Sequence, residues 1–130
     1  MLLEACTIKV NFRRVNLFFC LKGSIYDVAL DIRKGSETFG KYIGVNLSAD
    51  TPQAFYVPPG FAHGFAVSES SNAIILYKCT RLYQGAYDSG ISWASSNIKL
   101  PKNFIDTKKA ILSSKDSVAP SLTEELAVSV

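Results

Sequence analysis

A strict alternation over residues 24–32, SIYDVALDI, constrains the fold more than any other feature of this chain. Every second residue is apolar and lies on one face of an extended chain: Tyr26, Val28, Leu30 and Ile32. The opposite face carries Ile25 and Ala29 together with Asp27 and Asp31. A repeat of two residues matches a β-strand and not a helix, which repeats every ~3.6 residues. The pattern therefore predicts a β-strand over residues 24–32.

The remainder of the chain contains further short β-prone runs. These runs are RRVNLFFCL at 13–21, KYIGVNLS at 41–48, AFYV at 54–57, GFAV at 64–67 and AIILYKCTR at 73–81. Turn-forming segments such as RKGSETFG, ADTPQ and PPGFA separate them. Many short strands at close spacing predict a sandwich, barrel or jelly roll. Near the end, Ser121 and Glu124 have the spacing of a capping box, which predicts a short helix over 120–126.

The composition favours one folded domain that spans residues 1–130. Of these residues 48% are hydrophobic and 19% are charged, so a core of ordinary size can form. The net charge of +3 is small and the basic residues are scattered, which argues against nucleic acid and suits a small anionic ligand. The three cysteines show no paired spacing, and no apolar run approaches the ~20 residues of a membrane helix. We therefore expect a cytoplasmic protein without a membrane segment.

Several chemistries are excluded by what the chain lacks. Its single histidine, His63, cannot supply the several imidazoles that a transition-metal site in a β-barrel requires. The sequence contains no GxSxG elbow, no GxGxxG motif and no Walker motif. We therefore expect neither a bound metal nor a cofactor.

The positive signals for chemistry are His63, Tyr77 and Asp116. In the run 73–81, Tyr77 shares a face with three other side chains: Ile75, Cys79 and Arg81. In the run 63–67, HGFAV, His63 shares a face with Phe65 and Val67. If those faces line one interior, a phenol that can donate a proton and an imidazole that a carboxylate can orient meet in an apolar cavity.

Each of these residues also has a purely structural interpretation. A single histidine after a turn is commonly a hydrogen-bonded structural residue, and a tyrosine on a strand commonly packs in the core. An aspartate such as Asp116, close to a proline-containing turn, commonly caps that turn. From the residues alone, the interpretation stops at a β-domain with one candidate cavity.

Five blocks of this sequence resemble the dTDP-4-dehydrorhamnose 3,5-epimerases. The blocks stand in the order of that family and span residues 23–120: IYDVALDIRKGSETFGKYIGVNLSAD, VPPGFAHGFAVSE, ILYKCTRLY, GISW and LSSKDSVAP. Residues 1–22 match it poorly. The resemblance implies an all-β, metal-free cupin-type antiparallel jelly roll, also called a double-stranded β-helix, usually as a homodimer. It further implies an enzyme that inverts C3 and C5 of a dTDP-linked 4-keto-6-deoxy sugar in dTDP-L-rhamnose biosynthesis.

The resemblance also implies roles for individual residues. Tyr77 occupies the position of the catalytic acid, and Asp116 that of the carboxylate paired with the catalytic base. His63, Tyr83 and Lys115 occupy substrate-binding positions, with Tyr83 at the sugar and Lys115 near the diphosphate.

The chain departs from the family pattern at its start. The base of the family is a histidine in an RGLH segment, which this chain lacks, and a lysine of the family falls near Asn16. We therefore expect an N-terminally truncated epimerase with impaired activity. The alternative is a non-catalytic sugar-nucleotide-binding cupin or an inactive epimerase remnant.

Overall fold

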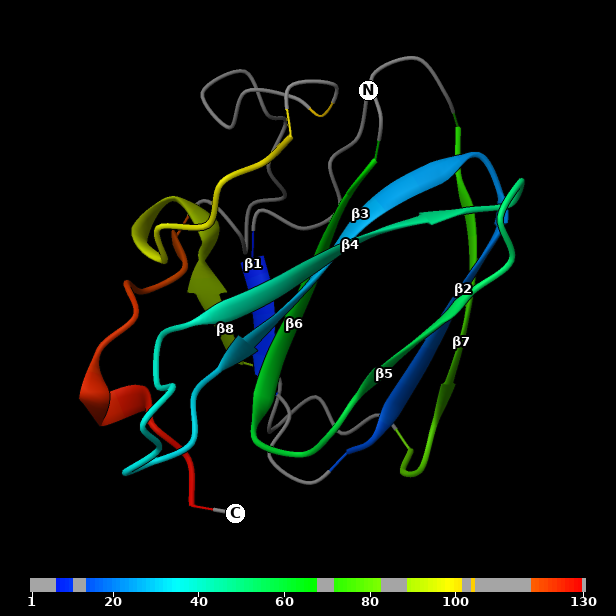
Figure 1. Ribbon diagram of the computed structural model, residues 1–130. Helices are drawn as coiled ribbons and strands as arrows, with labels where there is room; N and C mark the ends of the chain where they lie inside the picture. The colour runs from blue at the N-terminus through cyan, green and yellow to red at the C-terminus, as the bar shows by residue number, and fades with distance from the viewer. Residues whose placement is uncertain are drawn as a thin grey trace.

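The computed structural model of this protein describes residues 7–10, 14–67, 72–82, 89–101, 104 and 118–129 (Figure 1). These residues form eight strands: β1 (Thr7–Val10), β2 (Asn16–Lys22), β3 (Ser24–Asp31), β4 (Tyr42–Ser48), β5 (Ala54–Val57), β6 (Phe61–Val67), β7 (Ile74–Cys79) and β8 (Ser89–Ser92). Two short 3₁₀ turns accompany them, η2 (Trp93–Ser95) and η5 (Glu124–Leu126). The expectation of an all-β chain is confirmed.

The strands form two antiparallel sheets that face each other. The larger sheet has the order β4-β3-β6-β1-β8 and the smaller one has the order β5-β2-β7. The adjacent strands pair in antiparallel fashion throughout both sheets. In Figure 1 the small sheet lies beside the larger one, on the side opposite the C-terminal segment. This arrangement is a β-sandwich, as the short alternating runs predict.

Strand β3 is buried on both of its faces because it lies inside the larger sheet between two hydrophobic cores. Its residues Tyr26, Val28 and Leu30 belong to an outer core, together with Trp93, Phe104 and Val128 from later in the chain. Its residues Ile25 and Ala29 belong to an inner core between the two sheets. The inner core also contains the following side chains of the other strands: Phe18, Cys20, Leu47 and Val57. The two faces that the alternation predicts are therefore confirmed.

The predicted C-terminal helix is present only as a single 3₁₀ turn. It begins at Glu124 with Thr123 as its N-cap, and no side chain caps it. After this turn the chain docks beside the end of β3. The backbone N–H of Val128 donates to the carbonyl of Ile32, and Val128 forms a parallel β-bridge with Arg33. This docking onto the larger sheet ends the turn after three residues, so the spacing of Ser121 and Glu124 does not produce a capping box.

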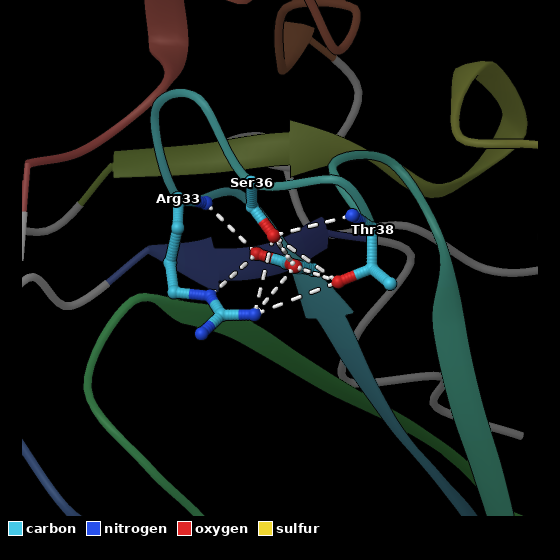
Figure 2. A network of polar contacts seen from close by, with 4 residues as sticks. Arg33, Ser36 and Thr38 are labelled. Atoms are coloured by element: carbon cyan, nitrogen blue, oxygen red, sulfur yellow. Dashed lines mark hydrogen bonds and ion pairs between the residues drawn. The ribbon is translucent and has the colours of Figure 1, made fainter.

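The carboxylate of Asp31 holds the turn after β3 through its bonds to Arg33, Ser36 and Thr38, the three side chains labelled in Figure 2. Arg33 donates from Nε to Oδ1 at 3.0 Å and from Nη2 to Oδ2 at 2.9 Å. The hydroxyls of Ser36 and Thr38 also donate to Oδ2. These bonds hold the pKa of the buried Asp31 carboxyl far below its usual range, with Arg33 as the largest cause. The cluster organises the connection to β4 and leaves both oxygens of Asp31 satisfied.

Within the described part of the chain, no helix is long and apolar enough to cross a membrane. Cys20, which is buried, and Cys79, which is exposed, are both free of disulfide bonds.

Candidate functional site

The imidazole of His63 lies on the inner face of the larger sheet. The segment VPPGF reverses the chain between β5 and β6, with Gly60 at a φ of 86° that favours glycine. The turn makes His63 the third residue of β6, directly opposite Ala29 of β3. Because Ala29 belongs to the inner core, His63 points between the sheets, on the face that the alternation of the run 63–67 assigns to His63, Phe65 and Val67.

Asp27 of β3 holds the ring of His63. Its side chain is fully buried, and its Oδ1 forms a hydrogen bond with Nε2 of His63. Burial raises the pKa of the Asp27 carboxyl above its ordinary value, while the bond to His63 acts in the opposite direction. In the described structure, Oδ2 of Asp27 has no hydrogen-bond partner. The carboxyl therefore orients the imidazole through Oδ1, and Oδ2 can accept a further hydrogen bond.

Phe18 of β2 connects this pair to Tyr77. Its ring stacks on His63 with the centroids 3.8 Å apart and the planes 10° apart. It also stacks on Tyr77, its direct neighbour on β7, at 5.6 Å. The imidazole and the phenol, from different sheets, thus contact the same aromatic ring.

Tyr77 is on the inner face of the small sheet, and 58% of the residue is exposed. It shares that face with Ile75 of the inner core and with the exposed Cys79, as predicted. This exposure follows from the position of β7 at an edge of the small sheet. A ligand can therefore approach the tyrosine from solvent while His63 remains mostly buried.

The other predicted site residues, Tyr83, Lys115 and Asp116, lie outside the described residues. Arg81 is described and exposed, just after the end of β7. Among the residues that the structure describes, no group of three or more His, Cys, Asp or Glu side chains is arranged to hold a metal ion.

Sequence reasoning missed two residues of the cluster, Asp27 and Phe18. Asp27 had a signal, because an acidic residue in the middle of an alternating apolar strand must either face solvent or be paired. The strand pattern shows that Asp27 and the apolar Ile25 and Ala29 share a face. The contact of Phe18 with the histidine could not be predicted, because nothing in the sequence of β2 indicates that Phe18 meets His63 across the sandwich.

Two facing antiparallel sheets of short strands define a β-sandwich of the class that includes jelly rolls, and polar groups that converge between the sheets suit the binding of a small molecule. A sequence model described as dTDP-4-dehydrorhamnose 3,5-epimerase matches residues 8–124. The chain therefore belongs to the dTDP-4-dehydrorhamnose 3,5-epimerase family, and the resemblance found in the sequence is confirmed.

Individual relatives agree with this assignment. The dTDP-4-dehydrorhamnose 3,5-epimerase of Methanothermobacter thermautotrophicus is 45% identical over 98 residues, which is 74% of this chain and 51% of the relative. That of Salmonella typhimurium is 43% identical over 107 residues, which is 82% of this chain and 57% of the relative. The chain thus spans about half the length of the curated relatives that it matches.

Solved structures of the family share the fold. A dTDP-6-deoxy-D-glucose-3,5-epimerase from Legionella pneumophila, in complex with dTDP-4-keto-L-rhamnose, superimposes with a TM-score of 0.80 at 33% identity. The match covers 96% of this chain and 66% of that one. An epimerase from Elizabethkingia anophelis gives a TM-score of 0.78 at 38% identity and covers 92% of this chain and 65% of that one. The predicted cupin-type antiparallel fold is therefore confirmed.

Proposed function

We propose that this chain binds a dTDP-linked 4-keto-6-deoxy sugar between its two sheets. The reaction that we propose for it is the 3,5-epimerisation step of dTDP-L-rhamnose biosynthesis. The observation that carries the proposal is the cluster of Asp27, His63, Phe18 and Tyr77, which joins a buried, hydrogen-bonded Asp–His pair to an accessible phenol. Family membership supplies the ligand class. We further propose that the protein acts in the cytoplasm.

The chemistry of epimerisation suits these groups. A C–H bond next to a ketone is weakly acidic, so a base can remove its proton to form an enolate. Inversion follows when an acid returns a proton to the opposite face of the same carbon. In our proposal the hydroxyl of Tyr77 is that acid, because it combines access from solvent with a fixed position beside Phe18.

His63 serves substrate binding in this proposal rather than proton abstraction. Its Nε2 is engaged by Asp27 and one ring face is covered by Phe18, so we assign the contact with a polar atom of the sugar to the other ring nitrogen, to which no described residue is hydrogen-bonded. Tyr83 and Lys115 are proposed as further binding residues, for the sugar and the diphosphate. Asp116 is proposed as the carboxylate that pairs with the base in relatives.

We propose that the 130-residue chain by itself catalyses epimerisation at or near the background rate. Its sequence contains one histidine, and that histidine is already held by Asp27. Loss of a general base commonly costs about 10²- to 10⁴-fold in rate. The alternative, a purely sugar-nucleotide-binding domain, shares the binding step and differs in having no proton transfer at all.

Two measurements test the proposal. Binding is followed by ligand-observed NMR with dTDP and with the dTDP-linked 4-keto-6-deoxy sugar. Catalysis is followed by the uptake of solvent deuterium at C3 and C5 of that sugar, with Tyr77→Phe as the variant that lacks only the hydroxyl. We expect binding together with exchange that is at most slightly faster than the protein-free rate, and any excess over that rate should disappear in Tyr77→Phe.

The possible outcomes separate the proposals. Binding without any exchange above the protein-free rate favours the non-catalytic alternative. Fast exchange that survives in Tyr77→Phe contradicts the role of the tyrosine. Failure to bind either ligand refutes the proposed function of this chain.

A further inference from the structure

Three aromatic rings are stacked between the two sheets. The ring of Phe18 lies against the imidazole of His63 at a centroid distance of 3.8 Å, with the planes 10° apart. It lies against the phenol of Tyr77 at 5.6 Å, with the planes 28° apart. His63 and Tyr77, which are both described, do not stack on each other, so they cover opposite faces of the Phe18 ring. Phe18 therefore fills the space between the imidazole and the phenol.

The position of Phe18 limits what a ligand can reach. Phe18 is only 5% exposed, and the side chain of His63 is only 11% exposed. A sugar ring that touches the imidazole and the phenol at the same time must enter the space that the Phe18 ring occupies. Movement of the exposed Tyr77 alone leaves the imidazole covered. Only displacement of Phe18 opens the space between the two groups.

The space taken by Phe18 has the thickness of one sugar ring. A pyranose is a six-membered ring like that of phenylalanine, and its carbon atoms need a contact distance of about 3.5–4 Å on each face. The stack already provides 3.8 Å on the side of His63. On the side of Tyr77 the centroid distance of 5.6 Å leaves room for a puckered ring and its substituents. Withdrawal of one six-membered ring therefore opens a slot for another.

We propose that Phe18 is the specificity-determining residue of the sugar subsite. Its ring holds the place of the pyranose in the free protein, and the sugar enters only when this ring leaves the stack. The inference rests on the proposed function and adds the position of the sugar ring, between His63 and Tyr77. It also adds the residue that controls access to this position.

Phe18 is held less firmly than the histidine that it covers. Nε2 of His63 is bonded to Asp27, and its strand β6 lies inside the larger sheet between β3 and β1. A phenylalanine ring has no polar group that can anchor it. Strand β2 pairs with the edge strand β7, whose side chains are mostly exposed. The ring of Phe18 therefore yields to the ligand, and it moves towards the open side at β7.

Displacement of Phe18 lowers the apparent affinity for the sugar. Exposure of a buried phenylalanine side chain costs on the order of tenfold to a hundredfold in an equilibrium constant, and only the open fraction of the protein binds the sugar ring. The nucleotide part of the ligand does not enter the slot and does not bear this cost. The wild type should therefore bind the sugar nucleotide little more tightly than it binds dTDP.

NMR titrations with dTDP and with the dTDP-linked 4-keto-6-deoxy sugar test the proposal in two variants. Phe18→Val removes the ring and keeps a residue that suits a β-strand, so it should bind the sugar nucleotide at least ~10-fold more tightly than the wild type. Its affinity for dTDP should stay within about twofold, because the nucleotide does not depend on the slot. Phe18→Tyr keeps a ring in the slot and should give no gain.

A control variant and a signal from His63 accompany the titrations. Phe19→Val makes the same truncation on the opposite face of β2 and should change neither affinity. The ring current of Phe18 shifts the imidazole C–H signals of His63 in the wild type, and Phe18→Val should abolish this shift. The sugar nucleotide should move the wild-type signals in the same direction, and dTDP should not. Fluorescence of the buried Trp93 verifies that each variant is folded.

The other outcomes overturn the inference in different ways. Weaker binding of the sugar nucleotide to Phe18→Val shows that the Phe18 ring is a contact of the sugar and does not hold its place. An equal gain for dTDP and for the sugar nucleotide shows that the slot receives the nucleobase. Unchanged affinities show that the sugar binds elsewhere, with the proposed function intact. Failure of every variant to bind either ligand refutes the proposed function together with this inference.

Discussion

At the scale of single residues, Asp27 and Asp31 of β3 are both buried but have opposite electrostatic surroundings. Asp31 accepts several hydrogen bonds, including two from Arg33, and its pKa is lowered. The carboxyl of Asp27 is bonded to His63, but the effect of burial is larger, so the pKa of Asp27 is raised above its ordinary value. The same residue type on the same strand therefore stabilises the fold in opposite ranges of pH.

For Asp31, stability should be lost in acid. Because its folded-state pKa is below the ordinary value of 3.8, its contribution is fully present above that value and is lost as the pH falls through the lower folded-state value. Asp31→Asn should cost about 2 kcal/mol at pH 7 and flatten the decrease in unfolding free energy between pH 4 and pH 2. Urea titrations at each pH measure this, with the exposed Asp50→Asn as control. An unchanged pH profile would contradict the prediction.

For Asp27, the sign is reversed. Because its folded-state pKa is raised, its contribution to stability is greatest below the ordinary value of 3.8 and is lost as the pH rises through the raised value. Asp27→Asn removes this dependence, so the stability of the variant relative to wild type should improve between pH 4 and pH 7. The same urea titrations measure it. A relative stability that worsens over that range would show that the interaction with His63 outweighs the effect of burial.

At the scale of elements, the one-residue connection between β2 and β3 depends on Gly23. Its φ is 72°, and an added Cβ would lie 2.5 Å from the backbone oxygen of Asn72. Gly35 has a similar φ of 74°, but nothing lies within 4 Å of the corresponding position. Both glycines avoid backbone strain, and Gly23 also permits a close approach of two chain segments.

We expect the two alanine substitutions to differ in cost. Gly35→Ala should cost about 1 kcal/mol from the positive φ alone. Gly23→Ala should cost roughly 2 kcal/mol more, because the backbone around Asn72 must move. Equilibrium denaturation of both variants gives the difference, and equal costs would mean that the segment at Asn72 yields freely.

At the scale of the whole molecule, β3 joins the two cores because it is buried against both of them. The sole tryptophan, Trp93, reports on the outer core, and the sole histidine, His63, reports on the face that lines the inner core. We expect tryptophan fluorescence and the imidazole NMR signal to give the same urea midpoint, as two-state unfolding requires. Two separated midpoints would show that the cores unfold independently.

Local sequence determined the strands and their faces. The alternation in SIYDVALDI specifies which side chains of β3 share a face, since a period of two is a property of the extended backbone itself. The same reasoning correctly places His63 with Phe65, and Tyr77 with Ile75. The motifs of residues 23–120 were also sufficient to identify the family.

Contacts between distant segments were decided by the tertiary structure alone. Asp27 and His63 are 36 residues apart, and their bond depends on the pairing register of β3 with β6. Phe18 reaches His63 only because the two sheets stack, and Val128 ends the last turn only because it docks beside Ile32. Alternation specifies the direction of a side chain but carries no information about which strand it will meet, because register and stacking arise from packing of the whole chain.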